Sequence, residues 1–174
     1  MVRDHFSGTS PCPQRAKARV TGNILPGIDL RDTSLPVGAV ISHLDLAPHP
    51  EGGFYRETWR AAASGPGERE AGTAILFLLA AGQRSHWHRV DASELWLWQG
   101  GAPLHLHLSE DGSSTTRLRI GPDLSQGETL QGVVRPHAWQ AAESLGNWSL
   151  VSCIVAPAFR FEGFELAPPG WQPG

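Results

Sequence analysis

The stretch Ser85–Gln99, SHWHRVDASELWLWQ, alternates in two runs around a short polar turn, VDAS. Alternation with a period of two is typical of half-buried strands, and the turn favours a hairpin. Residues two apart in a strand share a face, so we expect His86 and His88 to point the same way. Glu94 opens the second run and would return its carboxylate to the two imidazoles. The stretch predicts two strands and a polar cluster between them.

The same kind of pattern continues in both directions. Short alternating or apolar runs recur about every ten residues, separated by turn signals such as GPGE, EDGSS and SLGN. The runs are GGFYRETWR, GTAILFLLAAG, SHWHRV, ELWLWQ, PLHLHLS, TTRLRI, QGVVR, WQAAE, NWSLVSCIVAP and GFEL. There is no alternation of strands with helices, so the sequence predicts an all-β sandwich or barrel.

One short helix is expected before the strands. Thr33 or Ser34 can cap it, Pro36 suits its first turn, and apolar residues then recur at helical spacing up to Leu44, before Pro48. The preceding residues, 1–32, mix Gly, Pro, Ser and charges without a period, which favours a flexible leader. We therefore expect a leader over residues 1–32 and a single domain over residues 33–170.

Composition excludes several classes of partner. The 174 residues are 40% hydrophobic and 18% charged, with a net charge of −3, which offers no basic surface to nucleic acid. The longest apolar run, around Ala74–Ala81, is far shorter than the roughly 20 residues that cross a bilayer. We expect a cytoplasmic protein without a membrane partner, in which both cysteines, Cys12 and Cys153, are free thiols.

The group His86, His88 and Glu94 has two interpretations. Two imidazoles and a carboxylate suit Zn, Fe(II), Mn or Ni with positions left open for a substrate. Alternatively, the histidines are hydrogen-bonded core residues, since His105 and His107 show the same spacing with no acid after them. The spacing alone leaves both interpretations open.

A second cluster of polar residues lies in PEGGFYRET, which begins at Pro50. Two glycines after Glu51 permit a bend, and alternation then places Arg56 on one face and Tyr55 and Glu57 on the other. A buried Arg56 or Glu57 would form a structural ion pair or meet an anionic or hydroxyl-bearing ligand. Tyr55 is suited to a general acid, to a hydrogen bond with a ligand, or to a dimer interface.

Seven tryptophans stand against a single tyrosine. They serve either a large core or the wall of a pocket. Trp96 and Trp98 share the parity of Glu94, so all three are expected on one side of their strand. Gln131 and Gln140 fall near the heads of strands and would line the mouth of a barrel.

The order Gly82, His86, His88, Glu94, Gly101 resembles the first motif of the cupin superfamily. Five further segments are similar to one branch, the cupin-5 family, a domain of unknown function akin in fold to deoxysugar epimerases. They are PHPEGGFYRETWR, WHRVDASELW, GAPLHLHL, RPHAWQAA and CIVAPAFRFEGFEL. The resemblance covers roughly residues 35–167. It implies an all-β cupin jelly-roll β-barrel with one short N-terminal helix, and a homodimer.

The resemblance also bears on metal binding. Cupins supply a fourth ligand, a histidine, from a second motif of the form PxGxxH, where this chain reads RPHAWQ. When the two motifs are aligned through the Trp139–Gln140 pair, Gln140 takes the position of the ligand histidine and His137 replaces the glycine. The implied metal ligands are His86, His88, Glu94 and Gln140, and the cofactor is a divalent metal or none.

The function implied is that of a cupin with a small sugar-like or nucleotide-like molecule in its barrel. An enzyme of this kind would be a metal-assisted enzyme or an isomerase or epimerase in which His88 abstracts a proton and a Tyr or Glu returns it. The alternative is a binding module without catalysis or metal. The expected catalytic residues are His88, Glu94 and Tyr55; the expected ligand-binding residues are Glu51, Arg56, Trp96, Trp98, Gln131, Trp139 and Gln140.

Overall fold

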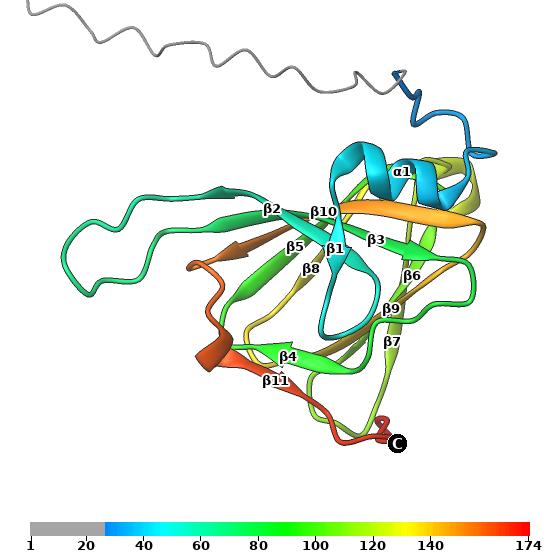
Figure 1. Cartoon of the computed structure of the whole chain (residues 1–174). Coiled ribbons are helices and arrows are strands. Elements are labelled where there is room, and N and C mark those ends of the chain that lie inside the picture. Colours follow the sequence, from blue (N-terminus) through cyan, green and yellow to red (C-terminus); the bar gives the residue numbers. More distant parts are fainter. Residues whose placement is uncertain (1–26) are drawn as a thin grey trace, which may run out of the picture.

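The structure, a computed structural model, describes residues 27–174 as two antiparallel sheets and one short helix (Figure 1). The larger sheet has the order β1-β2-β3-β10-β5-β8 and the smaller has the order β11-β4-β9-β6-β7. The strands are β1 (Ala47–Pro48), β2 (Phe54–Arg60), β3 (Thr73–Ala80), β4 (His88–Val90), β5 (Ser93–Gly101), β6 (Leu104–Ser109), β7 (Thr116–Ile120), β8 (Gln131–Val134), β9 (Trp139–Ser144), β10 (Trp148–Ala156) and β11 (Phe164–Leu166).

All ten predicted runs contain a strand, and the expected jelly-roll fold is confirmed. The two sheets face one another without closing into a continuous barrel. The main core lies between them, with Phe77, Trp96, Leu104, Leu106 and Val151 among its buried residues. Alternation predicted the strands well because each sheet has one face on this core.

The helix α1 (Val37–Leu44) lies on the outer face of the larger sheet (Figure 1). Val40 packs there with Leu78 of β3 and Trp148 and Leu150 of β10 in a second apolar cluster. The expected side-chain cap is absent, because the N-cap residue is Pro36. The structure thus confirms the helix and corrects its cap.

The predicted leader falls mainly on residues 1–26, which lie outside the described residues together with Cys12. Ile28 and Leu30 pack against the cluster under α1, and Cys153 is a buried free thiol. Two short 3-10 helices, Leu124–Gln126 and Phe161–Gly163, complete the described elements. None of the helices described is long and apolar enough to pass through a membrane.

Two local departures from strand geometry position the candidate site. β4 begins only at His88, so Ser85, His86 and Trp87 are not part of a strand. In β2, the register with β3 shifts between Glu57 and Trp59, which leaves Thr58 as a bulge. Because a bulge reverses the alternation that follows it, side chains after Thr58 exchange faces.

Candidate functional site in the jelly-roll cavity

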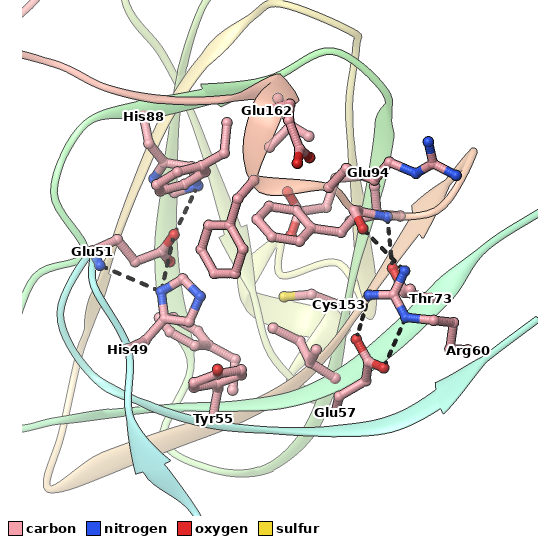
Figure 2. Close-up of a pocket in the computed structure, with 18 of the residues that line it drawn as sticks. His49, Glu51, Tyr55, Glu57, Arg60, Thr73, His88, Glu94, Cys153 and Glu162 are labelled. Carbon is pink, nitrogen blue, oxygen red and sulfur yellow. Dashed lines mark hydrogen bonds and ion pairs between the residues drawn. The ribbon is translucent and has the colours of Figure 1, made fainter. Parts of the chain in front are cut away.

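A cavity of about 530 Å³ is lined by strands of both sheets and by the segment that follows β10. A volume of this size suits a small-molecule ligand, since such sites usually measure about 300–1,000 Å³. Its lining residues are His49, Glu51, Tyr55, Glu57, Arg60, Glu70, Thr73, Ile75, Phe77, His88, Val90, Glu94, Cys153, Val155, Phe159, Arg160, Phe161, Glu162 and Phe164. Figure 2 shows His88, Glu51 and His49 gathered on one side of it.

His88 is 2% exposed and is held in one tautomer. Its Nδ1 atom lies 2.8 Å from the carbonyl oxygen of His86. A carbonyl can only accept a hydrogen bond, so Nδ1 carries the proton and Nε2 has a free lone pair. Burial lowers the pKa of His88 to about 4, so the ring is neutral at pH 7. The Nε2 atom faces Oε2 of Glu51 at 3.2 Å.

Glu51 is buried beside His88 because the following turn folds tightly. Gly52 and Gly53 have φ angles of 100° and 74°, and a side chain at Gly53 would meet the backbone of Leu78 at 2.7 Å. The backbone N–H of His86 donates to the Glu51 carbonyl at 2.7 Å, which ties the two segments together. These glycines therefore serve to bring Glu51 into the cavity.

Burial, with a smaller contribution from the nearby Glu94 carboxylate, raises the pKa of Glu51 well above its ordinary value. Burial therefore favours the protonated form of the carboxyl group, whose proton faces the lone pair on Nε2 of His88. In that form one proton can be exchanged between the two side chains.

His49 completes this group on the other side of Glu51. Its Nδ1 atom lies 3.5 Å from Oε2 of Glu51 and accepts the Glu51 backbone N–H at 3.4 Å. The ring packs edge-on against Tyr55, with 4.5 Å between centroids, and burial lowers the pKa of His49 to about 4. Sequence reasoning missed His49, although its place two residues before Glu51 was a usable signal.

Glu94 lies on β5 and is held by Gln140 from the opposite sheet. Its Oε2 atom accepts from Gln140 Nε2 at 2.6 Å, while Gln140 Oε1 accepts from Trp96 Nε1 at 2.9 Å. Burial raises the pKa of Glu94 to about 7, against the hydrogen bonds from Gln140 and Cys153. Glu94 is therefore a carboxyl group that can change protonation near neutral pH.

The four expected metal ligands do not fit a common ion. The His86 ring lines a separate hollow with Trp171, and its Nε2 atom lies 2.8 Å from the carbonyl oxygen of Ala167. The expected shared face of His86 and His88 is wrong, because strand alternation does not apply before His88. Gln140 does not line the cavity, since its amide joins Glu94 to Trp96.

The parity of the β5 tryptophans is confirmed, since Trp96 and Trp98 both pack in the core between the sheets. Neither residue lines the cavity. Trp139 lies outside the cavity. Its ring centroid is 4.5 Å from that of Trp171 and 4.6 Å from the central carbon of the Arg89 guanidinium. Gln131 is exposed on the edge strand β8. The aromatic wall is instead made by phenylalanines: Phe77, Phe159, Phe161 and Phe164.

The faces predicted for the PEGG strand are confirmed up to the bulge. Tyr55 and Glu57 line the cavity, and Arg56 is exposed and does not. After the bulge, Arg60 returns to the cavity and pairs with Glu57 at 2.8 Å, as Figure 2 shows. Arg60 could not be predicted to line the cavity, because nothing in the alternation of the sequence marks the bulge at Thr58.

Two facing antiparallel sheets that enclose a buried His–Glu group are the architecture expected of a cupin, and the amino-acid sequence matches a cupin family model. The family model of Cupin_5, cupin superfamily (DUF985), matches residues 38–167. The chain belongs to the Cupin_5 family. Two solved structures are similar to this Cupin_5 protein over most of both chains.

A hypothetical protein from Leishmania major is 34% identical, with a TM-score of 0.68, and the match covers 75% of this chain and 86% of that one. A protein from Shewanella oneidensis is 35% identical, with a TM-score of 0.72, and the match covers 76% and 85%.

More distant structures share only the fold. A dTDP sugar isomerase from Desulfovibrio desulfuricans is 16% identical, with a TM-score of 0.50 and coverage of 72% of this chain and 80% of that one. A search of curated proteins found no match. The Cupin_5 protein is therefore a cupin whose cavity suits a small molecule.

Proposed function

We propose that this Cupin_5 protein binds a small sugar-like carbonyl compound in the cavity and isomerises or epimerises it by proton transfer. The observation that carries the proposal is the contact between Nε2 of neutral His88 and the buried carboxyl of Glu51, 3.2 Å apart. Side chains with shifted pKa values that gather in one cavity are typical of acid–base catalysis.

The pair can act without a net change of charge. Glu51 donates its proton to the carbonyl oxygen of the substrate while Nε2 of His88 takes a proton from the adjacent carbon. The electron pair of the broken C–H bond forms the C=C bond of an enol. This leaves an imidazolium beside the Glu51 carboxylate, and their attraction offsets the low basicity of the buried ring.

Return of a proton completes the reaction. Delivery to the other carbon of an enediol gives an isomer, and delivery to the opposite face of the same carbon gives an epimer. Glu94 is the better second proton donor, because its pKa of about 7 lies near the working pH. Tyr55 is an alternative donor, since it also lines the cavity.

The cavity walls agree with a sugar-like ligand. Phe77 and Phe164 offer ring faces for the apolar side of a sugar, and Glu57 and Arg60 offer groups that bond hydroxyls. A dTDP sugar isomerase shares the fold, which adds support by analogy.

A binding module without catalysis is the second candidate. The concentration of phenylalanines around the cavity favours it, since an apolar enclosure retains a ligand without any proton transfer. In this case His88 and Glu51 would act only as hydrogen-bonding groups.

The test combines binding with isotope exchange. A panel of keto-sugars, aldo-sugars and sugar nucleotides is screened by thermal shift, and each ligand is then incubated with the protein in deuterated water. Deuterium at the carbon next to the carbonyl, seen by NMR, is expected for the wild type. His88→Asn and Glu51→Gln should each lower the exchange rate by roughly 10²–10⁴-fold.

The exposed His137 supplies the matched control, since His137→Asn should leave exchange unchanged. A ligand that binds the wild type without exchange would favour the binding module. Exchange that survives both cavity variants would contradict the assignment of His88 and Glu51.

A further inference from the structure

A second group of metal-binding residue types lies outside the cavity, on the outer face of the smaller sheet. Along β6, Leu104 and Leu106 are fully buried in the core, so the alternate residues His105 and His107 face outward. In the neighbouring strand β9, Glu143 is directly opposite His105. Three donors from two adjacent strands therefore meet on one face.

The two distances from the Glu143 carboxylate to the histidine nitrogens suit a tetrahedral ion. Oε1 of Glu143 lies 3.0 Å from Nε2 of His107 and 3.6 Å from Nδ1 of His105. Ligand atoms about 2.0–2.1 Å from a tetrahedral Zn²⁺ are about 3.3 Å apart, so the two separations bracket the required value. In the part of the chain that the structure describes, this is the sole group of three such residues whose donor atoms all lie within 4.8 Å.

The side chains are already restrained near this geometry. The His105 and His107 side chains are 17% and 14% exposed, and the His107 ring packs edge-on against Trp87. Glu143 is more open, with 38% of its side chain exposed, which leaves an approach for the ion and room for water ligands. Because the two histidines are already restrained, less side-chain entropy is lost when they bind an ion.

The surrounding charges set the limits of affinity. Across the sheet, Arg119 of β7 pairs with His105 in register, but its guanidinium is held by Glu128 at 2.8 Å. Arg117 of β7 pairs with His107 in register, and its positive charge disfavours the binding of a cation nearby.

We propose that His105, His107 and Glu143 form a binding site for a divalent transition-metal ion of the zinc type. The ion would join β6 to β9 and keep at least one coordination position open to solvent. This site is separate from the cavity and does not depend on the proposed isomerase activity. It lies on the outer face of the smaller sheet, whereas the cavity lies between the two sheets.

The test uses the untagged full chain, first treated with a chelator and then titrated with ZnCl₂ against a chromophoric chelator. We expect one equivalent of Zn²⁺ per chain and a rise in Tm with added Zn²⁺. His105→Ala, His107→Ala and Glu143→Gln should each weaken binding at least tenfold and remove the rise in Tm. Co²⁺ should give the intense visible bands of a four- or five-coordinate ion.

Two matched variants identify the site. His88→Ala removes the cavity histidine and His137→Asn removes an exposed single histidine, and both should bind Zn²⁺ as the wild type does. The proposal is overturned if the wild type takes up no Zn²⁺ at micromolar concentration, or if binding persists in the His105→Ala/His107→Ala double variant. Loss of binding in His88→Ala would overturn it as well, since the ion would then occupy the cavity.

Discussion

Nε2 of His88 lies 3.2 Å from Oε2 of Glu51, inside a cavity where both side chains are almost fully buried. Two different constraints produce this contact. The His86 carbonyl fixes the tautomer of the ring, and the Gly52–Gly53 turn carries the carboxyl inward. The result is a buried acid–base pair, on which our functional proposal rests.

The first prediction concerns the protonation of His88. Its ring should be the neutral Nδ1–H tautomer at pH 7 and should not titrate between pH 5 and 8, because burial lowers its pKa to about 4. ¹⁵N NMR of labelled protein measures this, with the signal assigned by its loss in His88→Asn. An Nε2–H tautomer, or a midpoint near the ordinary value of about 6.5, would contradict the geometry.

The second prediction concerns the pH dependence of stability. The pKa of Glu94 is raised from 4.5 to about 7 in the folded protein. Between these values the folded state binds more protons than the unfolded state, so this group makes the fold less stable as the pH rises from 4.5 to 7. Above pH 7 the full penalty, roughly 3 kcal/mol, is present.

Glu94→Gln should therefore raise Tm by several degrees at pH 8 and have little effect at pH 5, as measured by calorimetry. The exposed Glu162 supplies a control, because Glu162→Gln should change Tm equally little at both values. A difference between Glu94→Gln and wild type that is the same at pH 5 and pH 8 would refute the assigned cause.

The third prediction concerns Gln140, which joins Glu94 to Trp96 across the two sheets. Gln140→Leu leaves a buried carboxyl oxygen and a buried indole N–H without partners. The expected loss is roughly 2–5 kcal/mol of unfolding free energy, or a fall in Tm of about 5–15 °C. Gln131→Leu on the exposed edge strand should change stability by less than about 0.5 kcal/mol. Equal effects of the two substitutions would show that the hydrogen bonds of Gln140 to Glu94 and Trp96 do not contribute to stability.

The fourth prediction concerns assembly. The family resemblance leads us to expect a homodimer, and we propose the free edge of β2 as its interface. β1 covers only Tyr55 and Phe54 of that edge, and Trp59 beyond them is 51% exposed. Sedimentation equilibrium should give twice the chain mass of 18.8 kDa, and Trp59→Glu should yield a monomer.

Val133 tests the location of this interface. It is similarly exposed, at 54%, on the strand at the other edge of the same sheet. Val133→Glu should leave the dimer intact. A wild-type monomer would refute assembly itself, and a monomer produced only by Val133→Glu would move the interface to β8.

Local pattern predicted the strands and much of the site. PEGGFYRET supplied Glu51 and Tyr55 as candidate site residues and SHWHRVDASE supplied His88 and Glu94, and all four line the cavity. The period of two correctly grouped Tyr55 with Glu57 on one face of β2, but it left open which face is inward. The same rule failed at His86 and at Arg60. An irregular segment and a bulge respectively interrupt the strand there, and neither has a marker in the sequence.

The sequence by itself determined the strand order along the chain, which side chains share a face in several strands, and the family, because these follow from short-range alternation and specific motifs. Tertiary structure alone decided which polar groups meet. His49, Glu51 and His88 come together across two segments, phenylalanines rather than tryptophans wall the cavity, and Gln140 bonds to Glu94. Such contacts depend on register and burial between distant segments, and burial also sets the pKa values that determine their chemistry.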